Sequence, residues 1–226
     1  MGGFSPEGHW YYEAKSSVIL KDLKKNLQQP PKILDLGAGS GYFSRKIIDL
    51  FGGNANCVDI NYSSEYKLDS ITYSRTPVLS SYNVVLLLDV LEHVENPREL
   101  FEEVVTKAEQ GCLIFVTVPA FMQLWSGHDE FLGHFKRFRL TEIRSLVEEV
   151  GSDLKVLRGR YLFSSLFPIV FLQRKLSKKK ESYLKPANPI LNQLLIIVCR
   201  IDHWFSRNSL FGVSAYLALK LVGKKR

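Results

Sequence analysis

The stretch ILDLGAGSG at residues 33–41 constrains the fold of this chain more than any other. An apolar run ends at Asp35 and meets closely spaced glycines, and the following residues 42–51 are compatible with a helix. The glycines are Gly37, Gly39 and Gly41. Glycine is needed where the backbone takes a positive φ or approaches a ligand with no room for a Cβ. The pattern predicts a buried strand, a tight turn and the start of a helix.

A second acidic residue, Asp59, follows 22 residues after Gly37, at the end of the next apolar run, Ala55–Val58. Two strands joined by a crossover helix place this carboxylate beside the glycine turn. There it can accept hydrogen bonds from both hydroxyls of a ribose. The sequence therefore predicts a nucleoside site.

The spacing of the turn distinguishes between nucleoside ligands. Dinucleotide-binding turns use GxGxxG and hold a pyrophosphate at the helix N-terminus, whereas this turn reads DxGxGxG. It resembles motif I of the class I S-adenosylmethionine-dependent methyltransferases. The resemblance implies S-adenosyl-L-methionine as cofactor, with Asp59 as the ribose-binding acid. The cofactor-binding residues predicted here are Asp35, Gly37, Ala38, Gly39, Gly41, Asp59 and Ile60. An ordinary turn without a cofactor and a nicotinamide enzyme stay open as alternatives.

Apolar strand-like segments alternate with helix-like segments along the chain. Their continuous apolar character is typical of parallel strands covered on both faces, so we expect a doubly wound, Rossmann-like α/β sheet. The resemblance implies seven strands in the order 3-2-1-4-5-7-6, with strand 7 antiparallel. The expected strands are 32–35, 54–58, 71–74, 82–88, 111–118, 154–161 and 211–222.

We expect a single domain over residues 1–226 with four parts. Residues 1–29 form an N-terminal helix that covers the cofactor, and residues 30–161 form the core. Residues 162–210 form a helical insertion between strands 6 and 7, and residues 211–226 form the final strand and a basic tail. The apolar runs of the insertion are shorter than the 18–20 residues, roughly, that cross a bilayer. The insertion is either a helical pair packed on the domain, with a hydrophobic rim near the substrate, or a pair lying in a membrane interface.

Charge is distributed unevenly over the chain. Residues 158–226 carry 14 lysines and arginines and two acids, a net charge of +12, while the whole chain has +7. The excess is either a solvated basic face or a surface for an anionic membrane or substrate. Nucleic acid is not favoured, since no nucleic-acid-binding module is recognised. Three cysteines without CxxC pairing, and an N-terminus without a signal-peptide pattern, favour the cytoplasm, including the inner face of a membrane.

The segment Asp89–Val94 reads DVLEHV and resembles that of ubiquinone- and menaquinone-type methyltransferases. The resemblance implies that Asp89, Val90, Leu91 and His93 lie against the methionine part of the cofactor. His93 could instead cap or pack before the next helix. Asp89, Glu92 and His93 also resemble a divalent-metal cluster proposed for some quinone O-methyltransferases. Three ligands would need a fourth from elsewhere, and we assign no metal.

The N-terminal segment His9-Trp10-Tyr11-Tyr12 with Lys15 resembles one that closes over the cofactor in related bacterial enzymes. Trp10 and Tyr11 could cover the sulfonium by cation–π attraction. Alternatively, they only anchor the helix on the domain.

The segment 118–138 contains VPA, W, HD, GH and KRF in the order of a family pattern that it resembles. Long loops between strand and helix often carry function. His128 and His134 are the candidate bases, because histidine titrates near neutrality, and Asp129 can orient one of them. A hydrogen-bonded clamp without proton transfer is the alternative.

These observations predict methyl transfer to a small, apolar or lipid-linked acceptor by in-line displacement. An NAD-dependent oxidoreductase and an inactive cofactor-binding or membrane-associated scaffold are the competing functions. The sequence leaves the acceptor, the atom methylated and the oligomeric state open.

Overall fold

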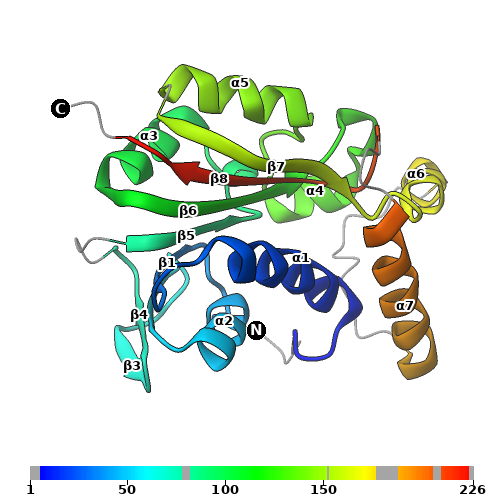
Figure 1. The fold of residues 1–226 in the computed structure, drawn as a ribbon. Coiled ribbons are helices and arrows are strands. Elements are labelled where there is room, and N and C mark those ends of the chain that lie inside the picture. Colours follow the sequence, from blue (N-terminus) through cyan, green and yellow to red (C-terminus); the bar gives the residue numbers. More distant parts are fainter. Residues whose placement is uncertain (1–5, 78–81, 152, 177–187, 206–209, 224–226) are drawn as a thin grey trace.

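The computed structural model describes residues 6–77, 82–151, 153–176, 188–205 and 210–223 (Figure 1). Its centre is an eight-stranded sheet in the order β3-β4-β2-β1-β5-β6-β8-β7. The strands are β1 Lys32–Leu36, β2 Asn54–Val58, β3 Tyr66–Leu68, β4 Ile71–Ser74, β5 Tyr82–Leu88, β6 Ala108–Pro119, β7 Leu154–Leu162 and β8 Ser214–Leu221.

The predicted doubly wound α/β class is confirmed, but the predicted count of seven strands is wrong. The additional strand is β3, which pairs antiparallel with β4 at the edge of the sheet. Its three residues are all exposed, so the sequence has no apolar run that predicts this strand. The other seven strands lie beside one another in the predicted order, and β8 is antiparallel to both β6 and β7.

Helices cover both faces of the sheet, as Figure 1 shows. The helices α1 (Trp10–Asn26) and α2 (Tyr42–Phe51) pack on one face, and α3 (Pro97–Lys107) and α5 (Leu140–Val150) on the other. Successive side chains of β5 alternate between the two cores: Val84 packs with α1 and α2, and Val85 with α3 and α5. This alternation is what a strand buried on both faces requires.

The predicted helical insertion lies between β7 and β8. It contains α6 (Phe167–Leu176) and α7 (Pro189–Phe205). The amide of Asn192 on α7 donates a hydrogen bond to the carbonyl of Gly8 over 2.8 Å, and its oxygen accepts one from the Trp10 N–H over 2.9 Å. These contacts fix α7 against the start of α1. Among the described helices, none combines the length and apolar character needed to cross a membrane.

The short helix α4 (Gly127–Leu132) and the 3-10 turns Leu91–His93 and Met122–Leu124 follow strands at their carboxyl ends. Because ligands of open α/β sheets bind at this edge, these segments surround the candidate site. The division of residues 1–226 into four functional parts stays a prediction.

Candidate functional site: a cavity at the carboxyl edge of the sheet

A cavity of about 440 Å³ lies at the carboxyl ends of β1, β5 and β6. Its walls also include parts of α1, α4 and α6, so segments far apart in the sequence meet there. A larger cavity of about 620 Å³ is bounded by α1, α2, β7 and α7. We place the site in the smaller cavity, because the glycine turn lines it. Its side-chain walls include Trp10, Tyr11, Tyr12, Asp35, Phe43, Asp89, Glu92, His93, His128, Leu132, His134, Arg137, Val170, Gln173 and Arg174.

The glycine turn forms one wall, through Gly37, Ala38 and Gly39. Gly37 has φ +66°, and a Cβ there would lie 2.8 Å from Cγ2 of Val90. Gly39 has φ +53° and open space where its Cβ would be. Thus packing excludes a side chain at the first position, and backbone conformation disfavours one at the second.

Asp35 lies beneath this turn and is almost fully buried. Burial raises the pKa of its carboxyl to about 7, although the Ser44 hydroxyl donates a hydrogen bond to it over 2.7 Å. The Asp35 carboxyl therefore carries a proton for part of the time at neutral pH and can act as donor or acceptor.

Asp59 is placed beside the turn, at the end of β2. Its Oδ2 accepts a hydrogen bond from the Gly39 N–H over 3.0 Å, and its Oδ1 accepts one from the Asn61 N–H over 2.9 Å. These bonds hold the carboxylate at the rim of the cavity rather than in its wall. Ile60 is 77% exposed beside it, where a bound nucleoside could cover it.

Three other predicted cofactor residues also lie outside the cavity wall. Val90 packs under Gly37, Leu91 is the first residue of the 3-10 turn and is buried in the core, and Gly41 packs on the ring of Tyr73. They support the shape of the turn, and their predicted contact with cofactor stays a prediction.

Asp89 is held by a polar cluster between α1 and the sheet. Its carboxylate forms an ion pair with Lys15, accepts a hydrogen bond from the Tyr11 hydroxyl over 2.9 Å, and accepts another from the Thr117 hydroxyl over 3.0 Å. Asp89 has φ +58°, a conformation that costs about 1–3 kcal/mol in a non-glycine residue and is common at functional sites. The cluster thus ties the N-terminal helix to the floor of the cavity.

Trp10 and Tyr11 lie at the cavity, and their predicted role as a cover over the cofactor stays a prediction. The Tyr11 ring stacks on Phe163 with centroids 5.3 Å apart. Burial, followed by the charge of Asp89, raises the pKa of Tyr11 well above its ordinary value. The Tyr11 hydroxyl is therefore protonated and remains a hydrogen-bond donor to Asp89.

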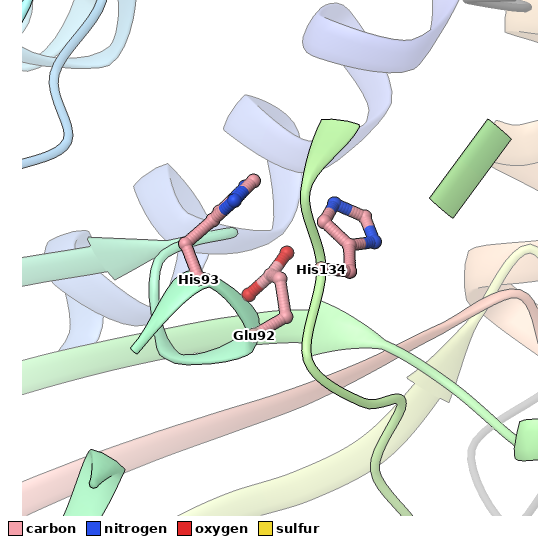
Figure 2. Close-up of side chains that lie close together, drawn as sticks. All are labelled: Glu92, His93 and His134. Atoms are coloured by element: carbon pink, nitrogen blue, oxygen red, sulfur yellow. The ribbon is translucent and has the colours of Figure 1, made fainter. Parts of the chain in front are cut away.

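Figure 2 shows Glu92, His93 and His134 with their polar atoms turned toward one another. One ligand atom from each lies within 4.8 Å of the others, which is close enough to hold a metal ion. Oε2 of Glu92 has no hydrogen-bond partner among the described residues. Burial, then the charge of Asp89, raises the pKa of Glu92 well above its ordinary range. Burial, then His134, lowers the pKa of His93.

The metal cluster suggested by resemblance is therefore arranged differently from the expectation. Asp89 is engaged by Lys15, Tyr11 and Thr117, and His134 lies next to Glu92 and His93 in its place. His93 and His134 are 41 residues apart in the sequence, so no local motif predicts that they lie side by side.

Asp129 orients His134 from below the cavity. Its Oδ1 is 2.9 Å from Nδ1 of His134 and accepts a hydrogen bond from Nε of Arg137 over 2.8 Å; its Oδ2 accepts one from Arg174 over 3.0 Å. Burial would raise the pKa of Asp129, but the His134 hydrogen bond and the two arginine charges lower it below its ordinary range. Because the carboxylate only accepts, Nδ1 of His134 carries the hydrogen, and Nε2 is the free acceptor of the neutral ring.

Of the predicted catalytic residues, His128 and His134 line the cavity and Asp129 lies behind the wall. Sequence reasoning missed Tyr12, Arg137 and Arg174 as wall residues. Arg174 carried no signal, since it lies in the insertion and reaches Asp129 across 45 residues of sequence.

A family model for a methyltransferase domain matches residues 8–155, well over half of the chain. The chain belongs to the class I S-adenosylmethionine-dependent methyltransferases. S-adenosyl-L-methionine is therefore the cofactor of this methyltransferase, and the nicotinamide alternative is not favoured.

The chain is 29% identical over 114 residues to the mitochondrial ubiquinone biosynthesis O-methyltransferase of Schizosaccharomyces pombe. The match covers 42% of this chain and 40% of the relative, so the chain spans about two fifths of the length of the curated relative it matches.

Solved structures are similar at the level of the fold. Phosphoethanolamine N-methyltransferase 2 of Haemonchus contortus, with S-adenosylhomocysteine bound, has TM-score 0.55 and 16% identity, over 93% of this chain and 53% of that one. Coclaurine N-methyltransferase has TM-score 0.55 and 15% identity, over 96% and 75% of the two chains. The [4+2]-cyclase SpnF has TM-score 0.56 and 10% identity, over 92% and 80%. Since a cyclase shares this fold, the fold alone does not set the reaction.

Proposed function

We propose that this methyltransferase transfers the methyl group to a small apolar or lipid-linked acceptor by in-line displacement, with His134 as the base for an acceptor that must lose a proton. The observation that carries the proposal is the common cavity of the glycine turn, His134 and α6.

The residues present fit the cofactor. A volume of about 440 Å³ is within the usual range of ligand sites, and Gly37 and Gly39 line the cavity with backbone alone. Asp59 would hold the ribose and Asp89 the methionine end, with Trp10 and Tyr11 as the aromatic cover. When bound, S-adenosylmethionine supplies an electrophilic methyl group on a sulfonium.

His134 is the better placed of the two candidate bases. Asp129 fixes its Nδ1 as the donor over 2.9 Å, which leaves Nε2 to accept a proton on the side of Glu92 and His93 (Figure 2). Burial raises the pKa of Glu92, which disfavours the ionised form that a base requires. Asp129 acts as a positioning residue, because it lies behind His134.

An apolar acceptor is supported by the part of the cavity wall that α4 and α6 contribute. Leu132 and Val170 contribute apolar wall there, and the exposed apolar residues Phe131 and Leu172 lie on the same helices, α4 and α6. Apolar wall is typical of small-molecule sites, in which polar groups fix the orientation of the ligand.

The test is incorporation of labelled methyl groups from S-adenosylmethionine into two acceptor sets. One set contains a prenylated hydroquinone, a long-chain phenol and a fatty acid; the other contains ethanolamine and glycine. We expect label in the first set, and a loss of ~100-fold or more in His134→Gln with unchanged affinity for S-adenosylhomocysteine. The exposed neighbour Glu130→Gln is the control.

Two results contradict the proposal. Label confined to the polar acceptors would refute the apolar acceptor class. Tight binding of S-adenosylhomocysteine without any transfer would favour the scaffold function instead.

A further inference from the structure

The helix α7 exposes an apolar stripe to solvent. Its members recur at the spacing of one helix face and are 51–75% exposed: Ile190, Leu194, Ile197 and Ile201. The opposite face packs on the domain through Asn192, which bonds to the start of α1, and through the buried Cys199. A surface helix in water has the reverse arrangement, with polar residues outward.

The helix α6 repeats this arrangement. Ile169, Leu172 and Leu176 are 59–76% exposed and lie on one face of the helix, and α6 has no fully buried residue. Figure 1 places α6 and α7 at the same end of the molecule. The strand register agrees, because Leu162 and Pro119 both pair with Ser214 at the carboxyl edge of the sheet. The two helices thus form one exposed apolar surface, which we call the insertion surface.

The exposed charges on the described residues of α6 and α7 are basic. Lys175 and Arg200 are exposed on the two helices, and the sequence of residues 177–187 between the helices has four lysines and one glutamate. The only acid within α6 and α7 is Asp202, which is buried and accepts hydrogen bonds from the N–H groups of Ser164 and Ser165.

This combination selects among possible occupants. A second copy of the chain would bring one basic surface against another, which is unfavourable. An anionic bilayer accepts apolar side chains at its headgroup boundary and attracts lysine and arginine around them. We propose that α6 and α7 lie flat on an anionic lipid surface, with the seven apolar residues of the insertion surface in the headgroup region.

The lipid contact also offers a route for the acceptor to the cavity. This route rests on the proposed function. The inner residues of α6, namely Val170, Gln173 and Arg174, line the candidate cavity. A molecule leaving the lipid surface along α6 therefore arrives at His134 without crossing the core.

The test is co-sedimentation of the full chain with vesicles of phosphatidylcholine, with and without phosphatidylglycerol. We expect binding to the anionic vesicles that weakens with added salt. The double variant Leu194→Glu/Ile197→Glu should weaken it at least ~10-fold, because two carboxylates replace inserted apolar groups. The matched control is Leu50→Glu/Leu68→Glu, which changes leucines of similar exposure, 63% and 53%, on α2 and β3. Control binding should stay within about twofold of wild type.

No cofactor or acceptor is present in this assay, so its outcome is independent of the methyl-transfer test. Unchanged thermal melting verifies that the variants are folded. The proposal is overturned if wild type does not bind anionic vesicles or binds neutral vesicles equally well. It is also overturned if the α7 variant and the control variant lose vesicle binding to the same extent. It is also overturned if sedimentation velocity shows a wild-type dimer that the α7 variant dissociates, since a second copy is then the occupant.

Discussion

Replacing Asp129 by Asn tests how much a buried ionic cluster contributes to stability compared with an exposed ion pair. The Asp129–Arg137 pair and the Arg98–Glu102 pair both have an N–O distance of 2.8 Å. The side chains of the first are 0% and 2% exposed, and those of the second 43% and 53%. The two pairs therefore differ in their access to water and in their other partners, which are His134 and Arg174 for Asp129 and Glu149 for Arg98.

Asp129→Asn removes the carboxylate that compensates Arg137 and Arg174 and orients His134. Breaking a buried pair from one side costs about 3–5 kcal/mol, because the other charge stays buried. One kcal/mol lowers the melting temperature of a domain this size by about 2–4 °C. The melting temperature of Asp129→Asn should therefore be lower than that of wild type by about 6–20 °C. Glu102→Gln removes an exposed pair worth about 0.2–1 kcal/mol, so its fall should not exceed about 4 °C.

Thermal unfolding of both variants at pH 7, monitored by circular dichroism, measures the two decreases in melting temperature. The pH dependence provides a second check. Since the pKa of Asp129 is lowered in the fold, its stabilising contribution is present above about pH 4 and decreases below it. The gap between wild type and Asp129→Asn should thus narrow at pH 3. Equal falls in the two variants at pH 7 would refute the reasoning from burial.

Three further outcomes follow from the site. Glu92→Gln should have a higher melting temperature than wild type, and the difference should grow as the pH rises from 5 to 8. The reason is that the raised pKa of Glu92 disfavours ionisation in the folded protein, whereas the unfolded chain ionises above about pH 4.3. A difference in melting temperature that stays constant with pH contradicts this. Asp89→Asn should destabilise the protein more than Lys15→Met. The lysine side chain is 1% exposed and the aspartate side chain 33% exposed, so the charge left without its partner is shielded from water in the first variant and reaches water in the second. The free energies of unfolding in urea decide the order. His134→Gln should lower the turnover number without weakening S-adenosylhomocysteine binding, and a parallel loss of both would assign His134 to the cofactor site instead.

The sequence was sufficient for the parts of the fold with strong local patterns. The apolar run before Asp35 and the glycine turn predicted β1 and the start of α2, and continuous apolar runs predicted β2, β4 and β5. The strand β3 was not predictable in this way, because its three exposed residues carry no burial pattern. Its residue Tyr66 stacks on Tyr73 of the neighbouring strand, with ring centroids 4.5 Å apart, a contact that stabilises the pairing of β3 with β4.

The candidate site was predictable only where its residues share one motif. The glycine turn and the Asp89 segment each gave several cavity residues, since consecutive residues at a strand end face the same edge. The contact between Glu92 and His134, and that between Arg174 and Asp129, join residues 42 and 45 positions apart. Only the packing of α4 and α6 over the sheet brings them together, and no local pattern encodes that packing.

The most direct test of the account is calorimetric titration of wild type, Asp59→Ala and the exposed control Asp49→Ala with S-adenosylhomocysteine, S-adenosylmethionine and NAD. Wild type and the control should bind both S-adenosyl ligands and not NAD. Asp59→Ala, with unchanged melting, should bind them at least ~10-fold more weakly, because hydrogen bonds to a charged group are lost. Unchanged affinity in folded Asp59→Ala, or binding of NAD by wild type, would contradict the account.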